Sequence, residues 1–242
     1  MKRQKKAKLS NVQIIALGFF IMILLGTGLL MLPIASVEPG GASFGDALFT
    51  ATSASCVTGL VQQDTGTYWT TFGQMVIIVL IQIGGLGFMT IATLFLLLLR
   101  RRMGLRQREV VVEGISYNQL GGFAPFIRRV FLGTLLIEGL GAVLLSVRFA
   151  GEMGLGRGIY YGVWHSVSAF CNAGFDLMGR YSGPYSSFTA YAGDPLVSLT
   201  ICALILVGGL GFLVWDDLVR NKLRWRRYRL QTKVVLTVTA AL

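Results

Sequence analysis

TATSASCVTGLVQQD, at residues 50–64, is a short run of Ser, Thr and Cys that leads to a single glycine. It lies in a part of the chain without Lys or Arg, since neither occurs from residue 34 to residue 71. A second run of the same kind, WHSVSAFCNAGFD, occupies residues 164–176. Each run stands between two long apolar segments. The fold that the sequence predicts depends on these runs and on the segments beside them.

The composition is typical of a membrane protein. Of 242 residues, 54% are hydrophobic and 14% are charged, and 31 are glycine, which departs from the averages of soluble domains. Four stretches are uncharged or nearly so, at residues 14–34, 72–99, 130–147 and 195–215. Each reaches or approaches the roughly 20 helical residues that cross the hydrocarbon core of a bilayer. The sequence therefore predicts four membrane spans.

The positions of the basic residues explain the formal net charge of +11. Nineteen of the 22 Lys and Arg residues lie within residues 2–8, 100–129 and 220–233. Cytoplasmic flanks of membrane spans collect such residues. This pattern favours a multi-pass protein of the cytoplasmic membrane with its N-terminus in the cytoplasm, and a lipid bilayer rather than nucleic acid as partner. The loops at residues 35–71 and 148–194 then face outward.

The chain contains an internal repeat. When Gly59 is aligned with Gly174, an offset of 115 residues, a serine, an alanine and a cysteine coincide in the two runs. Further on, LIQIGGLGF at residues 80–88 matches LILVGGLGF at residues 204–212. Repeats of this kind are common in transport proteins.

We interpret the chain as an all-α membrane protein built from two tandem repeats, each a span, a re-entrant pore loop and a second span. The first repeat covers residues 1–110 and the second covers residues 111–231. Residues 232–242 open another apolar segment, which we interpret as the truncated start of a third repeat. The chain is therefore expected to be part of a longer protein.

The first polar run is predicted to enter the membrane and turn back. Ser43 and Asp46 are placed as a capping box for a helix over residues 44–55, and twelve helical residues give about 18 Å, too short to cross. Unpaired backbone at membrane depth is tolerated only where it lines a water-filled path. We expect residues 56–59 to return as an extended strand whose carbonyl oxygens replace the hydration shell of an ion. Gly59 would supply the permissive dihedrals.

The second run offers the same parts. A helix is expected over residues 159–170, followed by CNAGFD with Gly174 in the equivalent place. The C-terminal end of such a helix carries about half a negative charge, which favours a cation. Coordination by carbonyl groups needs only backbone, and this explains why both runs are polar but uncharged.

TSASCVTGL, SVSAFCNAGF and GGLGFMT together resemble the membrane subunit of the Trk/Ktr potassium uptake family, and the Ktr type most closely. The resemblance covers the whole chain and implies four repeats around one ion path, of which this chain holds the N-terminal half. It implies uptake of K⁺ as the transported ion, with sodium coupling left open and no other cofactor. It also implies a homodimer and a cytoplasmic ring of nucleotide-binding regulatory subunits of the RCK/KTN type. It marks as filter residues Val57, Thr58, Gly59, Asn172, Ala173 and Gly174, with support from Cys56, Cys171 and Asp176.

Other interpretations of the two runs stay open at this stage. They could be ordinary outer loops with turn glycines, and the whole chain could be a non-conducting membrane scaffold component. A tandem-pore potassium channel would normally carry TVGYG-like filters with two glycines, whereas each run here has one. An enzyme is not expected, because a Ser-His-Asp site that uses Ser166 or Ser168 with Asp176 fails on geometry, since neighbours on a helix do not face each other.

Several further residues have two interpretations each. Glu138, near the middle of an apolar stretch, is either functional or hydrogen-bonded to a neighbouring helix. His165 is either a pH-sensing group or a support behind the filter, and Asp176 either attracts cations or caps a turn. The glycines of the two GGLGF segments allow close helix contact or hinge motion. Asp194 and Pro195 predict the start of a helix.

Overall fold

The computed structural model describes residues 10–87, 123–222 and 224–241. This part of the chain is helical apart from its connections, and the only β pairing within it is an isolated antiparallel bridge between Ser36 and Trp69. Its elements are α1 (Asn11–Leu30), α2 (Phe44–Cys56), α3 (Thr71–Leu86), α6 (Phe123–Met153), α7 (Leu155–Phe170), α8 (Gly179–Ser182), η1 (Thr189–Tyr191), α9 (Pro195–Gly209), α10 (Phe212–Asn221), η2 (Trp225–Arg227) and α11 (Leu230–Ala241). The prediction of an all-helical protein is confirmed for these residues.

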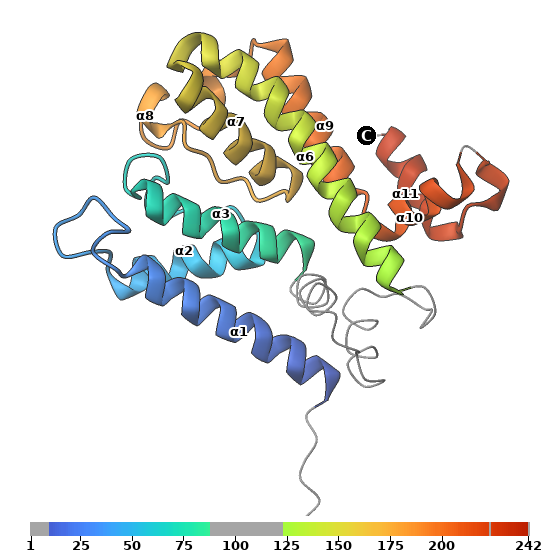
Figure 1. Cartoon of the computed structure of the whole chain (residues 1–242), viewed down its shortest axis with the longest axis horizontal. Helices are drawn as coiled ribbons and strands as arrows, with labels where there is room; N and C mark the ends of the chain where they lie inside the picture. Colours follow the sequence, from blue (N-terminus) through green and yellow to red (C-terminus); the bar gives the residue numbers. More distant parts are fainter. Residues whose placement is uncertain (1–9, 88–122, 223, 242) are drawn as a thin grey trace, which may run out of the picture.

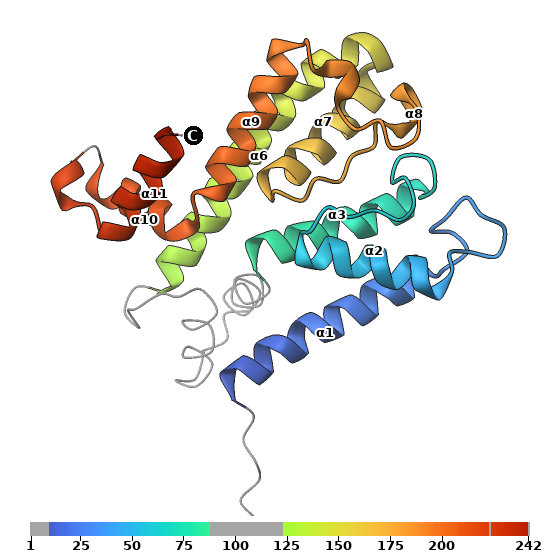
Figure 2. The same cartoon turned by 180° about the vertical axis from the view of Figure 1, so that it is seen from behind.

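The helices form two groups that lie side by side (Figure 1). In the first group the short helix α2 packs against both α1 and α3, and in the second α7 packs against both α6 and α9. Contacts between α3 and α7 join the groups. Seen from behind, α9 runs along α6 (Figure 2). Each group therefore places the helix that ends in a polar run, α2 or α7, between two apolar helices.

The starts of the helices follow from local capping. Ser43 precedes α2 and its hydroxyl accepts a hydrogen bond from the backbone N–H of Asp46, so the predicted start at residue 44 is confirmed. Asp194 accepts from the N–H groups of Leu196 and Val197 at the start of α9, which confirms that predicted cap. The predicted helix over residues 159–170 begins earlier, at Leu155.

Two of the four predicted spans correspond to single long apolar helices, by length and composition. Both α1 and α6 contain stretches long and apolar enough to cross a membrane, Val12–Leu30 and Pro125–Met153. The helix expected over residues 72–99 ends at Leu86, where Gly87 has a φ of 80°. Residues 88–99 lie outside the described residues.

The span predicted over residues 195–215 is bent, and its two helices are together long and apolar enough to cross a membrane once. Helix α9 ends at Gly209 and α10 begins at Phe212, with an angle of 88° between them. The cause is Gly211, whose φ of 85° is incompatible with continuing a right-handed helix. Past the bend, the buried Asp216 accepts from Arg129 (Nη2 to Oδ1, 2.6 Å) and from Arg220 (Nε to Oδ2, 2.9 Å).

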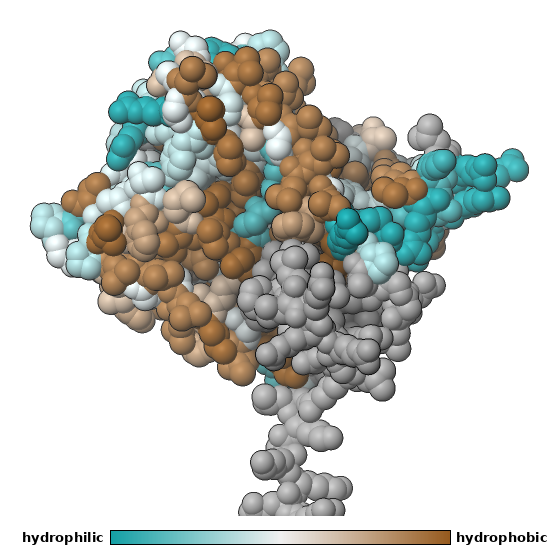
Figure 3. Space-filling model, in the orientation of Figure 1, coloured by the Kyte–Doolittle hydropathy of each residue, from teal (hydrophilic) through white to brown (hydrophobic). Residues whose placement is uncertain are grey.

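The outer surfaces of the helices are apolar. Large hydrophobic side chains are exposed along α1, α6 and α9, among them Leu25, Val147 and Leu199 at 65%, 68% and 70% exposure. Figure 3 shows hydrophobic residues over a large part of one face, with hydrophilic residues at the right-hand end beyond α10 and α11 and in smaller patches at the left. A continuous apolar surface of this extent is unfavourable in water, and a bilayer explains it.

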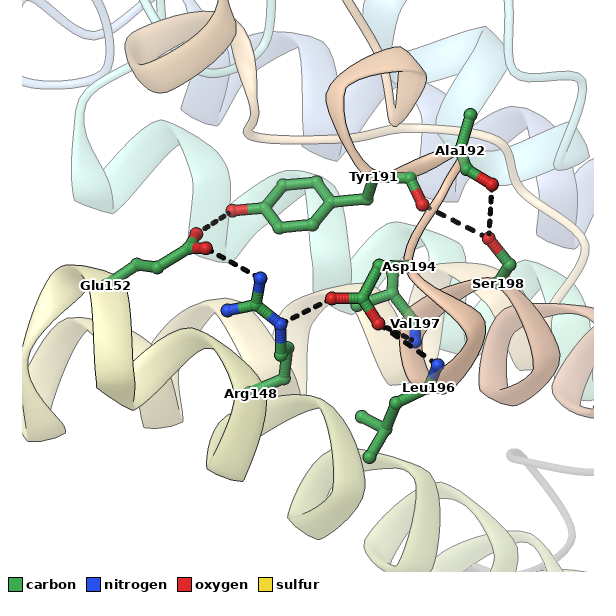
Figure 4. Close-up of polar contacts among 8 residues, drawn as sticks. All are labelled: Arg148, Glu152, Tyr191, Ala192, Asp194, Leu196, Val197 and Ser198. Carbon is green, nitrogen blue, oxygen red and sulfur yellow. Dashed lines mark hydrogen bonds and ion pairs between the residues drawn. The ribbon is translucent and has the colours of Figure 1, made fainter.

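A polar network ties α6 to the connection that precedes α9 (Figure 4). The guanidinium of Arg148 donates to Asp194 and also contacts Glu152 at 2.7 Å (Nη2 to Oε1). The hydroxyl of Tyr191 donates to Glu152 at 2.6 Å. The hydrogen bond from Arg148 holds the pKa of Asp194 below its usual range, and burial together with the hydrogen bond to Glu152 raises the pKa of Tyr191. The network fixes the start of α9 against α6.

Small residues allow α6 and α7 to pack closely. A Cβ atom added at Gly158 would lie 2.6 Å from the Cα atom of Ala150, and one added at Gly162 would lie 2.8 Å from the carbonyl oxygen of Ala142. These glycines stand four residues apart and so share one face of α7. The backbones of the two helices are therefore nearly in contact.

We expect Gly158→Ala to destabilise the protein by about 1–3 kcal/mol, because the added methyl group overlaps the backbone of α6. The measurement is the apparent melting temperature of the complete protein in detergent. Gly156→Ala on the same helix is the matched control, since nothing lies within 4 Å of a Cβ atom at Gly156. Equal melting temperatures for the two variants would contradict the close packing of α6 and α7.

Candidate functional site

The first polar run ends α2 and turns the chain sharply. Val57 follows the last residue of α2 and has φ 57° and ψ 45°, in the left-handed region. Its N–H donates to the carbonyl of Ala54 (3.3 Å), and the N–H of Thr58 donates to the carbonyl of Ser53 (3.0 Å). This pair of bonds is a Schellman closure, which satisfies carbonyl groups left free at a helix end.

The second polar run ends α7 in the same way. Asn172 has a φ of 58°. Its N–H donates to the carbonyl of Ala169 (3.0 Å), and the N–H of Ala173 donates to the carbonyl of Ser168 (2.8 Å). Each of these bonds stands 115 residues after its counterpart at α2, the offset found in the sequence.

The prediction of an extended strand over residues 56–59 is wrong. Cys56 is the last residue of α2, and Val57 is left-handed rather than extended. A β-branched residue rarely has a positive φ, and the conformation costs roughly 1–3 kcal/mol. The closure of the helix end overrides the extended preference of valine.

In both runs the sign of φ alternates along the turn. Val57 and Gly59 have positive φ values and Thr58 between them has a negative one. Asn172 and Gly174 likewise have positive φ values on either side of Ala173.

The two turns lie against each other. Gly59 has a φ of 76° and Gly174 a φ of 75°. A Cβ atom added at Gly59 would overlap the carbonyl oxygen of Ala173 and lie 3.5 Å from the Cα atom of Gly174. The fold thus brings together two single-glycine turns that are far apart in the sequence.

Glycines of the GGLGF segments support both turns from outside. A Cβ atom at Gly84 would overlap the carbonyl oxygen of Ser55, and one at Gly208 would overlap that of Phe170. Ser55 and Phe170 are equivalent residues of the two runs. The predicted role of these glycines in close helix contact is confirmed at both places. The third glycine of each segment has a positive φ, and Gly87 caps the end of α3 whereas Gly211 precedes the start of α10.

The remaining predicted site residues surround the two turns. Thr58 is exposed, and its hydroxyl is 2.8 Å from that of Ser53. Cys56 is exposed and Cys171 is buried. Asp176 accepts a hydrogen bond from the N–H of Met178 (2.8 Å), so it does cap a turn, and its attraction for cations stays a prediction.

His165 supports the segment that follows the second turn. It is buried, and its Nε2 atom accepts a hydrogen bond from the N–H of Leu177 at 3.0 Å. Its Nδ1 atom lies 2.7 Å from the carbonyl oxygen of Tyr161. These partners suit the neutral tautomer with the proton on Nδ1. These contacts agree with the supporting interpretation of His165, and its role behind a filter stays a prediction.

Glu138 is hydrogen-bonded to a neighbouring helix, as one of its two interpretations requires. Gln82 on α3 donates from Nε2 to both carboxylate oxygens of Glu138, at 3.0 and 3.2 Å. The amide oxygen of Gln82 faces the thiol of Cys171 at 3.8 Å. This chain of contacts links α6, α3 and the end of α7.

Sequence reasoning missed two buried polar residues that bind the connections between the helices. Gln74 on α3 donates to the carbonyl groups of Thr65 (3.2 Å) and Trp69 (2.9 Å) and accepts from the hydroxyl of Tyr160 (2.9 Å). Asp64 accepts three hydrogen bonds in the connections that follow the turns. A glutamine within an apolar helix and an acidic residue in a loop without basic residues were the available signals.

The fold and the surface define the class as a membrane protein with long apolar helices. The family described as "TrkH: Cation transport protein" matches residues 3–236. The chain belongs to this family of cation transport proteins, which is not a class of enzymes.

Curated relatives match almost the whole chain. It is 42% identical over 238 residues to the Ktr system potassium uptake protein B of Bacillus subtilis (strain 168), covering 98% of this chain and 52% of the relative. It is 42% identical over 242 residues to the potassium/sodium uptake protein NtpJ of Enterococcus hirae, covering 100% and 52%. The Ktr system potassium uptake protein B of Vibrio alginolyticus is 38% identical over 244 residues, with 99% and 51% covered. The chain spans about half the length of the curated relatives it matches.

We expect Gly208→Ala to disturb the end of α7, because the added methyl group overlaps the carbonyl oxygen of Phe170. The apparent melting temperature of the complete protein should fall by more than in Gly209→Ala. The neighbouring Gly209 is the matched control, since a Cβ atom there meets its nearest neighbour, the amide nitrogen of Asn172, only at 3.9 Å. A larger loss in Gly209→Ala would contradict this arrangement.

Proposed function

We propose that this chain forms half of the ion path of a potassium uptake protein in the cell membrane, and that its two single-glycine turns form half of the selectivity filter. The observation that carries the proposal is the contact between Gly59 and the Ala173–Gly174 peptide. Membership of the cation transport family and the names of the relatives support K⁺ as the ion. The name of the relative from Enterococcus hirae supports Na⁺ as a second or coupled ion.

Backbone geometry supports coordination by carbonyl groups. In an extended strand successive carbonyl groups point to opposite sides, so only alternate ones could face a central ion. A segment in which positive and negative φ alternate can align successive peptide groups, so that their N–H groups face one side and their carbonyl groups the other. Residues 57–59 and 172–174 both have this alternation. The filter set of Val57, Thr58, Gly59, Asn172, Ala173 and Gly174 is proposed on this basis.

The ends of α2 and α7 add a favourable electrostatic field. Each helix presents its C-terminal carbonyl groups beside its turn, and such an end carries about half a negative charge. Two helix ends that converge on one place favour a cation there without a fixed carboxylate. A dehydrated K⁺ could therefore bind and still leave.

The membrane arrangement is part of the proposal. In it, residues 1–110 and 111–231 are two span, re-entrant loop, span repeats with the N-terminus in the cytoplasm, and residues 232–242 begin a third. The equivalent hydrogen bonds at the ends of α2 and α7 support the repeat. Further repeats of the complete protein would complete the filter. A homodimer and a cytoplasmic nucleotide-binding regulatory ring are the proposed partners.

The filter assignment predicts that Gly59→Ser in the complete protein lowers the preference for K⁺ over Na⁺. A side chain at this position is strained by its positive φ and overlaps the carbonyl oxygen of Ala173. The measurement is uptake of K⁺ and Na⁺ in cells that lack other potassium uptake. Gly40→Ser is the control, since Gly40 has a φ of 96° in an outer connection with open space around it. Unchanged ion preference in Gly59→Ser would refute the assignment.

Glu138→Gln is expected to leave the ion preference unchanged. The substituted amide keeps an acceptor for Gln82, and among the described residues the carboxylate of Glu138 is linked to the proposed filter through Gln82 and Cys171. The same uptake measurement checks this. A changed ratio of K⁺ to Na⁺ uptake would show that the carboxylate itself acts on the ion.

A further inference from the structure

Asp64 is a buried carboxylate five residues after Gly59, with 6% of its surface exposed. Its Oδ1 atom accepts from the backbone N–H and from the hydroxyl of Thr67, both at 2.8 Å. Its Oδ2 atom accepts from the backbone N–H of Tyr185 at 2.8 Å. One oxygen thus binds the connection after the first turn, and the other binds the connection after the second.

Other contacts join the same two connections. The Nε atom of Arg180 donates to the carbonyl of Gly66 at 2.9 Å, and the hydroxyl of Tyr185 donates to the carbonyl of Gln62 at 3.0 Å. A Cβ atom added at Gly66 would lie 3.2 Å from the Cα atom of Leu177. Residues 62–67 and 177–185 are therefore packed backbone to backbone around Asp64.

Asp64 meets the residue that stands at the equivalent position after the second turn. A Cβ atom added at Gly179 would overlap the carboxylate of Asp64, and Gly179 is five residues after Gly174, as Asp64 is five residues after Gly59. The two segments that leave the turns touch at their start, through Gly59 and Gly174, and again five residues later. A pair of segments joined at both ends has a fixed register.

We propose that Asp64 is a positioning residue for the filter, holding the first turn in register with the second by binding both connections at once. The inference rests on the proposed function, because it assigns Asp64 to the filter that the two turns would form. A carboxylate is suited to this role because both of its oxygens are acceptors. An asparagine has one acceptor and one NH₂ group, so either Thr67 or Tyr185 would lose its partner.

The test uses the complete protein with two variants, Asp64→Asn and Gly179→Ala. Each changes one of the two residues that form the contact between Asp64 and Gly179. Each should reduce the preference for K⁺ over Na⁺ in uptake by about five- to ten-fold, because the asparagine leaves one donor unpaired and the methyl group of the alanine displaces the carboxylate. The double variant should lose less than the product of the single effects, because both remove one contact. Uptake is normalised to the amount of protein in the membrane.

Glu38→Gln is the matched control. Glu38 is an exposed carboxylate of the first outer connection and accepts from the hydroxyl of Tyr68 at 2.8 Å, so its loss removes the same charge without touching the register. An equal change of ion preference in Glu38→Gln would assign the effect to surface charge and overturn the inference. A fall in protein amount with an unchanged ion ratio would reduce Asp64 to a stability role and also overturn it.

Gly59→Ser separates failure of this inference from failure of the proposed function. If Gly59→Ser changes the ion preference while Asp64→Asn and Gly179→Ala do not, the filter stands and the positioning role of Asp64 is refuted. If none of the three variants changes the preference, both the filter and the role of Asp64 are refuted. A change in all three supports both.

Discussion

Two short helices end beside each other, and the rest of the described structure is arranged to make those ends possible. A helix end leaves carbonyl groups without partners inside the helix. In α2 and α7 some of these groups are satisfied by a Schellman closure onto a left-handed residue. The closure fixes the direction in which the chain leaves, and in both helices the chain then reaches a glycine with a positive φ. The contact between Gly59 and Gly174 follows from these two equal turns.

The helices around the turns must approach closely for this contact to form. Gly84 of α3 and Gly208 of α9 lie directly against backbone carbonyl groups at the ends of α2 and α7. Glycines on α7 bring it against α6. At each of these places a side chain would separate the elements by the size of a methyl group or more. Backbone packing therefore explains glycine at these positions.

Much of this arrangement is predictable from the sequence, because the signals concerned are local. Ser43 and Asp194 cap helices through hydrogen bonds to residues two or three positions away. The internal repeat identifies Gly59 and Gly174 as equivalent. The bend at Gly211 is not predictable from hydropathy, because the apolar run continues through it. Hydropathy says nothing about the direction in which the backbone runs. The left-handed conformation of Val57 is also not predictable from the sequence. Valine by itself favours an extended backbone, and only the closure of the helix end reverses this preference.

The buried polar contacts could not be predicted from the sequence, for a different reason. Asp64 binds Thr67, three residues later in the sequence, and also Tyr185, 121 residues later. Gln82 binds Glu138, 56 residues later. No local pattern marks which loop residue will meet a distant one. The repeat only shows that Asp64 and Gly179 are equivalent positions, which would suggest equal roles.

Equivalent positions cannot always hold equivalent side chains when they meet. Gly59 and Gly174 touch, and both are glycine because the turn needs a positive φ in each. Asp64 and Gly179 also touch, and here the carboxylate of one fills the space that a side chain of the other would need. Backbone geometry is thus repeated where backbone carbonyl groups would coordinate the ion. Side chains differ where the two halves hold each other, since only one of two facing positions can supply the group that joins them.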